Sequence, residues 1–455
     1  MRFKFVKCLI FIIIFLSFIR QAVSRELTPE EYVQRIFSAT QQAWPGLQQV
    51  WNTPLYNQLR LVVADDHNAW ALDSHSLTRI PYTEIQNRHL TVEYLSYKQI
   101  QWSDARPTLF VGLGPTRPDP QAPQWQSETS RVPTLFSLAT HEAFHFYVQT
   151  KKGVIPEPDK LTRSTPYPVQ DTPRFYRNNL IRALYATLRG EHKGLGEARY
   201  WYNLWTTVCP DDASRIRQTD LVEGTARYIE IAAEIMAQGH PFNSITFRHA
   251  LIEQLMEPSR YVYTQADSES YILGALAGFI LDEEKKTWQS RVAEGITPLE
   301  IVLEAVLPVP APLDHNLAAD VKEEVRKINS ATGPDIDAFR KRYTLAGVTR
   351  IFVDTDLAGS YSLSKGFFRV REIPYDLMVG LSSEAVWPSG HYRFNSVTAA
   401  AIDATTATTQ HQFLVLYAGK LPASNKGRLK IMNAEMSLDI PYPADVGKTH
   451  TIHLH

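Results

Sequence analysis

Two histidines and a glutamate lie close together in the segment HEAFH, at residues 141–145. Because residues four apart share one face of a helix, His141 and His145 can bind one metal ion through their imidazoles. Zinc is the metal that this HExxH pattern favours. Glu142 is then the expected general base, which activates a metal-bound water. The pattern therefore predicts a zinc site with hydrolytic chemistry.

The alternative is that these three polar side chains are satisfied core residues without a ligand. Pro133 suits the first turn of a helix, and Gly153, preceded by two lysines, suits its end. The segment between them is mostly apolar. Unpaired polar side chains inside such a buried helix would be costly to desolvate, so a compensating metal is the favoured interpretation.

A catalytic zinc needs a third protein ligand and one open position. The histidine-type extension HExxHxxGxxH is excluded, because the chain has Val148 and Lys151 at the required positions. A glutamate about 18 to 20 residues beyond the second histidine is also missing. The residues there are Ser, Thr and Pro, at positions 164–166. The third ligand must therefore lie farther along the chain.

Glu223 is the favoured third ligand, in the segment DLVEGTARYIE at residues 220–230. The segment reads as a helix, and Gly224 beside Glu223 should let this helix approach the HExxH helix closely. Glu230 is the second choice. The alternative is a solvated charged stripe whose members are spaced by three or four residues. Its members would be Asp220, Glu223, Arg227, Glu230 and Glu234.

Peptide hydrolysis also needs a hydrogen-bond donor for the oxyanion that develops on the scissile carbonyl. Tyr271 is the favoured donor, because it stands near the small residues Gly274, Ala275 and Gly278 on a predicted helix. Three rivals remain open, namely Tyr228, Tyr263 and His240.

These motifs, in this order, resemble the zincin metallopeptidases. "HEAFH" followed by "EGTARYIE" and then "YILGALAGFILDEEKKTW" is similar to exported bacterial gluzincin-like proteins, over about residues 55–305. The resemblance implies that an EG-A-Y segment supplies the third ligand, so that His141, His145 and Glu223 hold one Zn²⁺ ion. One departure is Arg227, where an acidic residue is often found. Asp220 or Glu230 could then orient an imidazole.

The resemblance also implies a fold. An upper lobe with a sheet and a lower helical lobe should enclose a cleft, in which an extended peptide pairs with an edge strand. The strand at 108–112, the last before the HExxH helix, is the candidate edge.

The N-terminus is typical of an exported protein. Residues 1–24 have a basic start, an apolar core and the small-residue end Ala22-Val23-Ser24, which together predict a signal peptide. Cleavage would leave a net charge of about −5. The mature chain has no basic block and no apolar run of membrane-spanning length. We therefore expect a periplasmic or secreted protein that binds no nucleic acid, with an uncleaved anchor as the alternative.

Cysteine usage excludes an internal disulfide after cleavage. Only Cys209 remains in the mature chain. It is most simply a packing residue, and a catalytic thiol is the alternative.

The chain is expected to be α+β, with a zincin-like catalytic core followed by a β-sandwich-like domain. An N-terminal α/β part at 25–130 should hold strands at 58–64, 90–97 and 108–112. A helical lobe follows at 131–306. A Pro-rich linker at 307–346 should carry two charged helices, at 316–328 and 334–343. The β domain at 347–455 completes the chain.

The sequence thus predicts an exported zinc metallopeptidase that acts on a peptide or protein, with a C-terminal β domain that could contact protein or glycan. Two alternatives stay open. One is a non-enzymatic binding or assembly protein with a structural metal. The other is a zinc hydrolase acting on a non-peptide amide or ester.

Overall fold

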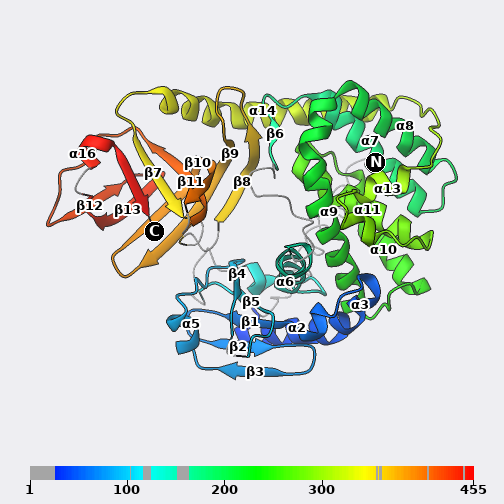
Figure 1. Cartoon of the computed structure of the whole chain (residues 1–455), viewed down its shortest axis with the longest axis horizontal. Coiled ribbons are helices and arrows are strands. Elements are labelled where there is room, and N and C mark those ends of the chain that lie inside the picture. The colour runs from blue at the N-terminus through cyan, green and yellow to red at the C-terminus, as the bar shows by residue number, and fades with distance from the viewer. Residues whose placement is uncertain are drawn as a thin grey trace, which may run out of the picture.

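The computed structural model describes residues 26–102, 104–115, 124–150, 163–354, 357, 361–406, 409–443 and 446–454. It confirms the α+β fold class, with a small mixed sheet, a helical lobe and a C-terminal sheet region. Figure 1 shows the small sheet at the bottom, the helices on the right and the larger sheet on the left. The predicted signal peptide lies outside the described residues. Among the described helices, none is long and apolar enough to cross a membrane.

The small sheet has five strands, in the order β3-β2-β1-β5-β4. β1 and β5 are parallel, and the other neighbours are antiparallel. Alternate residues of β1 and β5 face two different cores, so both faces of the sheet are buried. The bounds are β1 (Arg60–Ala64), β2 (Ala69–Leu72), β3 (Leu77–Ile80), β4 (Tyr97–Ile100) and β5 (Thr108–Gly112).

Two expectations for this sheet were wrong. Residues 90–97 do not form a strand, since a turn with Leu95 at positive φ interrupts them and β4 begins only at Tyr97. The strand at 108–112 is not the edge either. It is β5, and β4 covers its outer side, so the edge beside the HExxH helix is β4. Three of the four residues of β4 are exposed.

The HExxH helix is α6 (Thr134–Phe144), which starts directly after Pro133 and lies at the centre of Figure 1. It continues as one π-helical turn, η3 (His145–Gln149). Tyr147 fastens this turn to the sheet, because its hydroxyl accepts from Thr108 N at 3.0 Å and donates to Thr108 O at 2.7 Å. The α2 helix (Pro29–Ala43), with its Thr28 cap, packs against α6 and α9.

The described part of the helical lobe contains five long helices and two short ones. They are α7 (Asp171–Leu188), α8 (Gly194–Val208), α9 (Pro210–Ala237), α10 (Ile245–Arg260) and α11 (Ala266–Glu283), followed by α12 (Gln289–Val292) and α13 (Pro298–Leu303). α9 and α11 cross at two glycines. A Cβ on Gly274 would lie only 2.3 Å from the Gly224 Cα. Gly224 therefore serves the approach of α9 to α11, and the expectation that it faces α6 was wrong.

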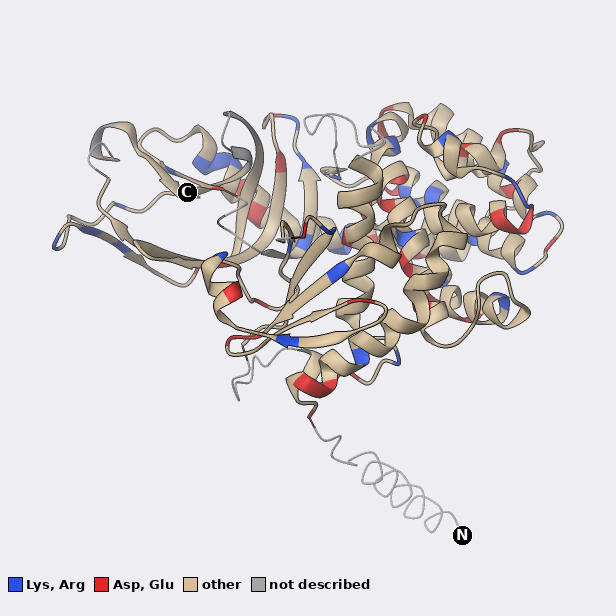
Figure 2. Ribbon diagram, turned by 60° about the horizontal axis from the view of Figure 1, so that its bottom comes forward, with Lys and Arg blue, Asp and Glu red and all other residues tan. Residues whose placement is uncertain are grey.

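A buried ion cluster joins α7, α9 and α11. Figure 2 shows that the helices of this lobe carry both acidic and basic positions. Arg174 pairs with Asp212 and Glu269, each at 2.6 Å. Arg177 pairs with Glu269 at 2.6 Å and with Asp220 at 2.7 Å. Because both guanidiniums are fully buried, removing any one partner would leave an uncompensated charge in the core. The cluster fixes α9 one turn before Glu223.

The linker region differs from the expectation of two helices. Residues 316–328 and 334–343 belong to one helix, α14 (His315–Thr344), which runs through Pro334. Val325 and Ile336, on either side of the proline, are both buried against the large sheet. This shared packing outweighs the helix-breaking tendency of the proline.

The C-terminal sheet has nine strands, most of which lie in the region 347–455 that was expected to be β. β10 is shared by two halves of the sheet, because its first residues pair with β13 and its last ones with β11. One apolar cluster lies on one face of the sheet, and α14 packs into a second apolar cluster on the other face. The strands are β6 (Thr165–Pro166), β7 (Thr349–Asp354), β8 (Tyr361–Arg369), β9 (Asp376–Trp387), β10 (Gly390–Thr406), β11 (Thr409–Tyr417), β12 (Arg428–Met432), β13 (Met436–Pro441) and β14 (Thr451–Leu454).

Candidate metal centre

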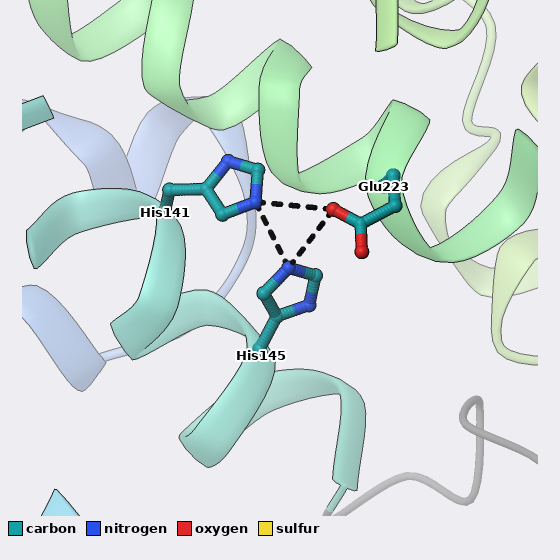
Figure 3. Close-up of side chains that lie close together, drawn as sticks. All are labelled: His141, His145 and Glu223. Atoms are coloured by element: carbon teal, nitrogen blue, oxygen red, sulfur yellow. Dashed lines mark hydrogen bonds and ion pairs between the residues drawn. The ribbon is translucent and has the colours of Figure 1, made fainter. Parts of the chain in front are cut away.

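The two histidines of α6 and Glu223 of α9 point toward one another (Figure 3). The Nε2 atoms of His141 and His145 are 2.9 Å apart. The Oε2 atom of Glu223 lies 3.3 Å from the first and 3.4 Å from the second. Each residue thus offers one ligand atom to a common point.

These separations suit a metal ion. Ligand atoms placed 2.0–2.2 Å from a tetrahedral ion lie about 3.3–3.6 Å from one another. The two distances to Glu223 fall in this range, and the two nitrogens lie slightly closer together, at 2.9 Å. His141 and Glu223 are buried, and His145 is half-buried. Two imidazole nitrogens and one carboxylate oxygen, brought together in a desolvated place, form a group that can hold a metal ion.

His141 is held by contacts to its helix and by a contact to its ring. Tyr56 donates to the Thr140 carbonyl oxygen at 2.8 Å, and the Trp44 indole donates to the Thr140 hydroxyl at 3.0 Å. These bonds fix the rotation of α6 about its axis. On the other side, the Nδ1 atom of His141 is 2.9 Å from Glu230 Oε2, one of the two partners anticipated from the sequence. Such a bond turns Nε2 toward the centre.

Asp220, the other anticipated partner, does not reach His141. It pairs with Arg177 in the buried ion cluster at 2.7 Å. Glu223 and Asp220 are about 5% and 4% exposed, so the interpretation of these residues as a solvated stripe was wrong. Arg227 forms an ion pair with Glu230 and compensates the negative charge of the Glu230 carboxylate.

The second histidine is oriented by a residue that the sequence analysis missed. His145 Nδ1 lies 2.6 Å from Gln149 Oε1. The Gln149 amide in turn donates to the Val222 carbonyl and the Thr225 hydroxyl, both at 2.8 Å. Gln149 stands four residues after His145, a spacing that could have revealed it. The π-helical turn thus fastens the end of α6 to α9, next to Glu223.

The carboxylates favour a cation at this place. Burial opposes protonation of the His141 ring, but its bonds to Glu223 and Glu230 outweigh burial and raise the pKa to about 10. Burial alone would raise the pKa of Glu223, yet the charges of Arg163 and of the histidines hold it well below its usual value. The site therefore keeps an ionised carboxylate beside the two imidazoles.

Glu142 lines a cleft of about 490 Å³ together with His141 and Tyr271. Burial raises the pKa of the Glu142 carboxyl above its usual value, against the charges of the two neighbouring histidines. The remaining lining is partly apolar and partly polar, with Leu95, Ser130, Val132, Thr134, Ser137, Leu138, Glu230 and Glu234. Glu142 thus faces a space that a substrate can enter.

Tyr271 of α11 lies at the same site, because its ring stacks on the His141 ring with centroids 5.8 Å apart. Burial raises the pKa of its phenol above the usual value, so the group keeps its proton. The three alternative donors, Tyr228, Tyr263 and His240, do not line this cleft. Tyr228 is buried and donates to Asp282, and Tyr263 donates to the Pro258 carbonyl. His240 follows the end of α9.

Arg163 is a second residue that sequence reasoning missed. Its Nη1 lies 3.2 Å from Glu223 Oε1, and its Nη2 donates to the Tyr271 hydroxyl at 2.7 Å. It precedes β6 and belongs to none of the motifs, so no local pattern marked it. Its guanidinium is the cation in direct contact with the candidate ligand set.

Cys209, between α8 and α9, does not line the cleft that Glu142 faces. It packs in a small apolar cluster with Trp205 and Ile216. Burial raises the pKa of its thiol, which disfavours the thiolate that a nucleophile needs. The packing interpretation therefore fits its surroundings.

Comparison of the chain with protein-family models, with curated proteins and with solved structures finds no match. The case for function therefore depends on the residues of this chain.

Proposed function

We propose that this chain is an exported zinc-dependent hydrolase of the gluzincin-like zincin type, which acts on peptides. The observation that carries the proposal is the convergence of the HExxH histidines with Glu223, 82 residues beyond His141, on a common point. A chance HExxH sequence has no reason to face a buried carboxylate from another helix.

Zinc is the metal that the donor set favours. Two imidazoles and one carboxylate match a common ligand set of catalytic zinc. Among the described residues, the group offers three His, Cys, Asp or Glu ligands, whereas a structural zinc site usually has four. Three ligands leave a coordination position for water or substrate, which supports a catalytic role over a structural one.

When bound, zinc polarises the scissile carbonyl and lowers the pKa of water. Glu142 accepts a proton from the attacking water at its carboxylate and passes it to the nitrogen of the leaving amine. Burial raises the pKa of Glu142, which favours the first step, since a stronger base takes the proton more readily. Tyr271 keeps its phenol proton and donates it in a hydrogen bond to the carbonyl oxygen as charge develops there.

An extended peptide would pair with β4. This strand forms the edge of the small sheet, and its neighbour β5 is joined through Tyr147 to the turn that follows α6. Main-chain hydrogen bonds to an open edge bind a peptide without regard to its sequence. The apolar residues Leu95, Val132 and Leu138 of the cleft would then accept an apolar side chain.

Export is the remaining part of the proposal. It rests on the signal-like residues 1–24 and places the enzyme in the periplasm or outside the cell.

The test is the substitution Glu142→Gln. It keeps the size of the side chain and removes its basic oxygen, so the variant should bind one zinc per chain but lose peptide hydrolysis. Zinc content by atomic absorption and turnover of a casein-derived peptide mixture are measured together. Hydrolysis at the wild-type rate by the zinc-loaded variant would refute the mechanism.

A further inference from the structure

Glu223 uses its two carboxylate oxygens for different partners. Oε2 faces the Nε2 atoms of His141 and His145, at 3.3 and 3.4 Å. Oε1 faces Nη1 of Arg163, at 3.2 Å. With one oxygen held by a guanidinium, the carboxylate can offer only the other oxygen to the centre. Arg163 thus fixes the rotation of the third ligand.

The same guanidinium also binds two residues of α11. Its Nε and Nη2 donate to the two oxygens of Asp267, at 3.0 and 3.2 Å, and Nη2 donates to the Tyr271 hydroxyl at 2.7 Å. The planar guanidinium of an arginine can make these bonds at the same time, whereas the ammonium of a lysine is a single point charge. Arg163 therefore sets the distance between the third ligand and the phenol.

Arg163 is held in turn by the C-terminal sheet. The residues that follow it form β6, which pairs in parallel with Phe368 and Arg369 of β8. Its guanidinium lies 5.3 Å from the centre of the Phe367 ring, also on β8. The neighbouring Ser164 donates to Asp376 of β9 at 2.8 Å. The C-terminal sheet therefore contacts Arg163 through Phe367 and holds the residues that follow Arg163 on two strands, β8 and β9.

A further contact connects the same strand to α11. The Gln265 amide, at the start of α11, donates to the Lys365 carbonyl of β8 at 3.0 Å. The adjacent Ala266 N–H donates to the Thr165 hydroxyl of β6 at 2.9 Å. The helix that carries Tyr271 and the strand that follows Arg163 thus meet the C-terminal sheet at the same place.

We propose that Arg163 is a positioning residue for Glu223 and Tyr271, and that the C-terminal sheet completes the metal centre by holding Arg163 through β6 and Phe367. This inference rests on the proposed zinc-hydrolase function. It assigns the C-terminal domain a part in metal binding, in addition to any contact with a partner.

The test measures zinc affinity of the full chain by competition with a chromophoric chelator. Arg163→Gln should weaken zinc binding about ten- to hundredfold, the range typical of residues that orient metal ligands. Arg163→Lys should fall between this variant and the wild type, because it keeps the charge but loses the planar guanidinium. Phe367→Leu, which keeps an apolar side chain but removes the ring, should weaken binding about two- to fivefold.

Arg217→Gln is the matched control. Arg217 lies on α9 as Glu223 does and forms a two-bond pair with Glu300, but it contacts no candidate ligand. Its loss should leave zinc affinity unchanged. Thermal unfolding of each variant shows whether it is folded. If Arg163→Gln does not fold, the zinc affinity of Phe367→Leu tests the proposal.

The outcomes separate the two proposals. A wild-type chain that binds no zinc would contradict the proposed function itself. A wild-type chain that binds zinc, together with Arg163→Gln and Phe367→Leu variants of equal affinity, would overturn only the role of Arg163 and the C-terminal sheet.

Discussion

Gly274→Ala should damage the metal centre although Gly274 contacts no metal ligand. The added Cβ would lie 2.3 Å from the Gly224 Cα and 2.6 Å from its carbonyl carbon. Both are backbone atoms, so no side-chain rotation can relieve the clash. Ordinary contact begins near 3.4 Å, and α9 and α11 must therefore separate by about 1 Å.

The separation should cost both stability and activity. Overpacking of this kind destabilises by about 1–3 kcal/mol, partly offset by the better helix propensity of alanine, worth about 1 kcal/mol. Glu223 is adjacent to Gly224, and Tyr271 lies one turn before Gly274, so the two side chains move apart with their helices. A misplacement of about 1 Å at a catalytic site can lower turnover roughly a hundredfold.

Zinc affinity, kcat/KM on a peptide substrate and the thermal unfolding midpoint would be measured for Gly274→Ala beside Gly333→Ala. Gly333 lies in α14, where the new Cβ would meet only the Tyr167 hydroxyl, at 2.9 Å. The control should therefore be neutral or slightly stabilised and fully active. Wild-type zinc affinity and turnover in a folded Gly274→Ala variant would refute the argument that the glycine crossing sets the site.

Three further results are expected. Tyr271→Phe should bind zinc normally but lower kcat about ten- to hundredfold, and unchanged turnover would remove it as the oxyanion donor. Glu230→Gln should weaken zinc binding about tenfold or more, since it frees the His141 ring, and equal affinity by chelator competition would contradict this role. Burial raises the pKa of Asp282 to about 6, so the stability it contributes is complete below its ordinary pKa of 3.8 and is lost as the pH rises through 6. Asp282→Asn should therefore unfold at a higher temperature at pH 7, with a gain of up to about 3 kcal/mol, and a lower midpoint than wild type would count against it.

The sequence was most informative where the signal is local. The spacing of His141 and His145 places both on one face of a helix, and the apolar residues around them indicate burial. Glu223 was reached because shorter spacings were excluded and because small residues beside it suggested a helix crossing. The crossing is present, but the helix that crosses α9 there is α11. A glycine in a helix indicates a close approach by another segment, but it does not identify that segment.

The remaining features depend on contacts between distant segments. Arg163 meets Asp267 across more than a hundred residues, and no periodicity predicts such a pair. Asp220 and Glu230 were both expected candidates to orient the His141 imidazole. Asp220 does not do so because Arg177 binds it in the core. Strand order is equally non-local. The expectation that β5 forms the edge was wrong because β4, which precedes it in sequence, pairs with its outer side.

Zinc-edge anomalous diffraction from crystals of the zinc-loaded chain tests the central claim most directly. We predict one anomalous peak at about 2.0–2.2 Å from the Nε2 atoms of His141 and His145 and from Glu223 Oε2, with the fourth position open to water. A peak elsewhere, or a fourth protein ligand that closes the site, would contradict the account of a catalytic zinc centre.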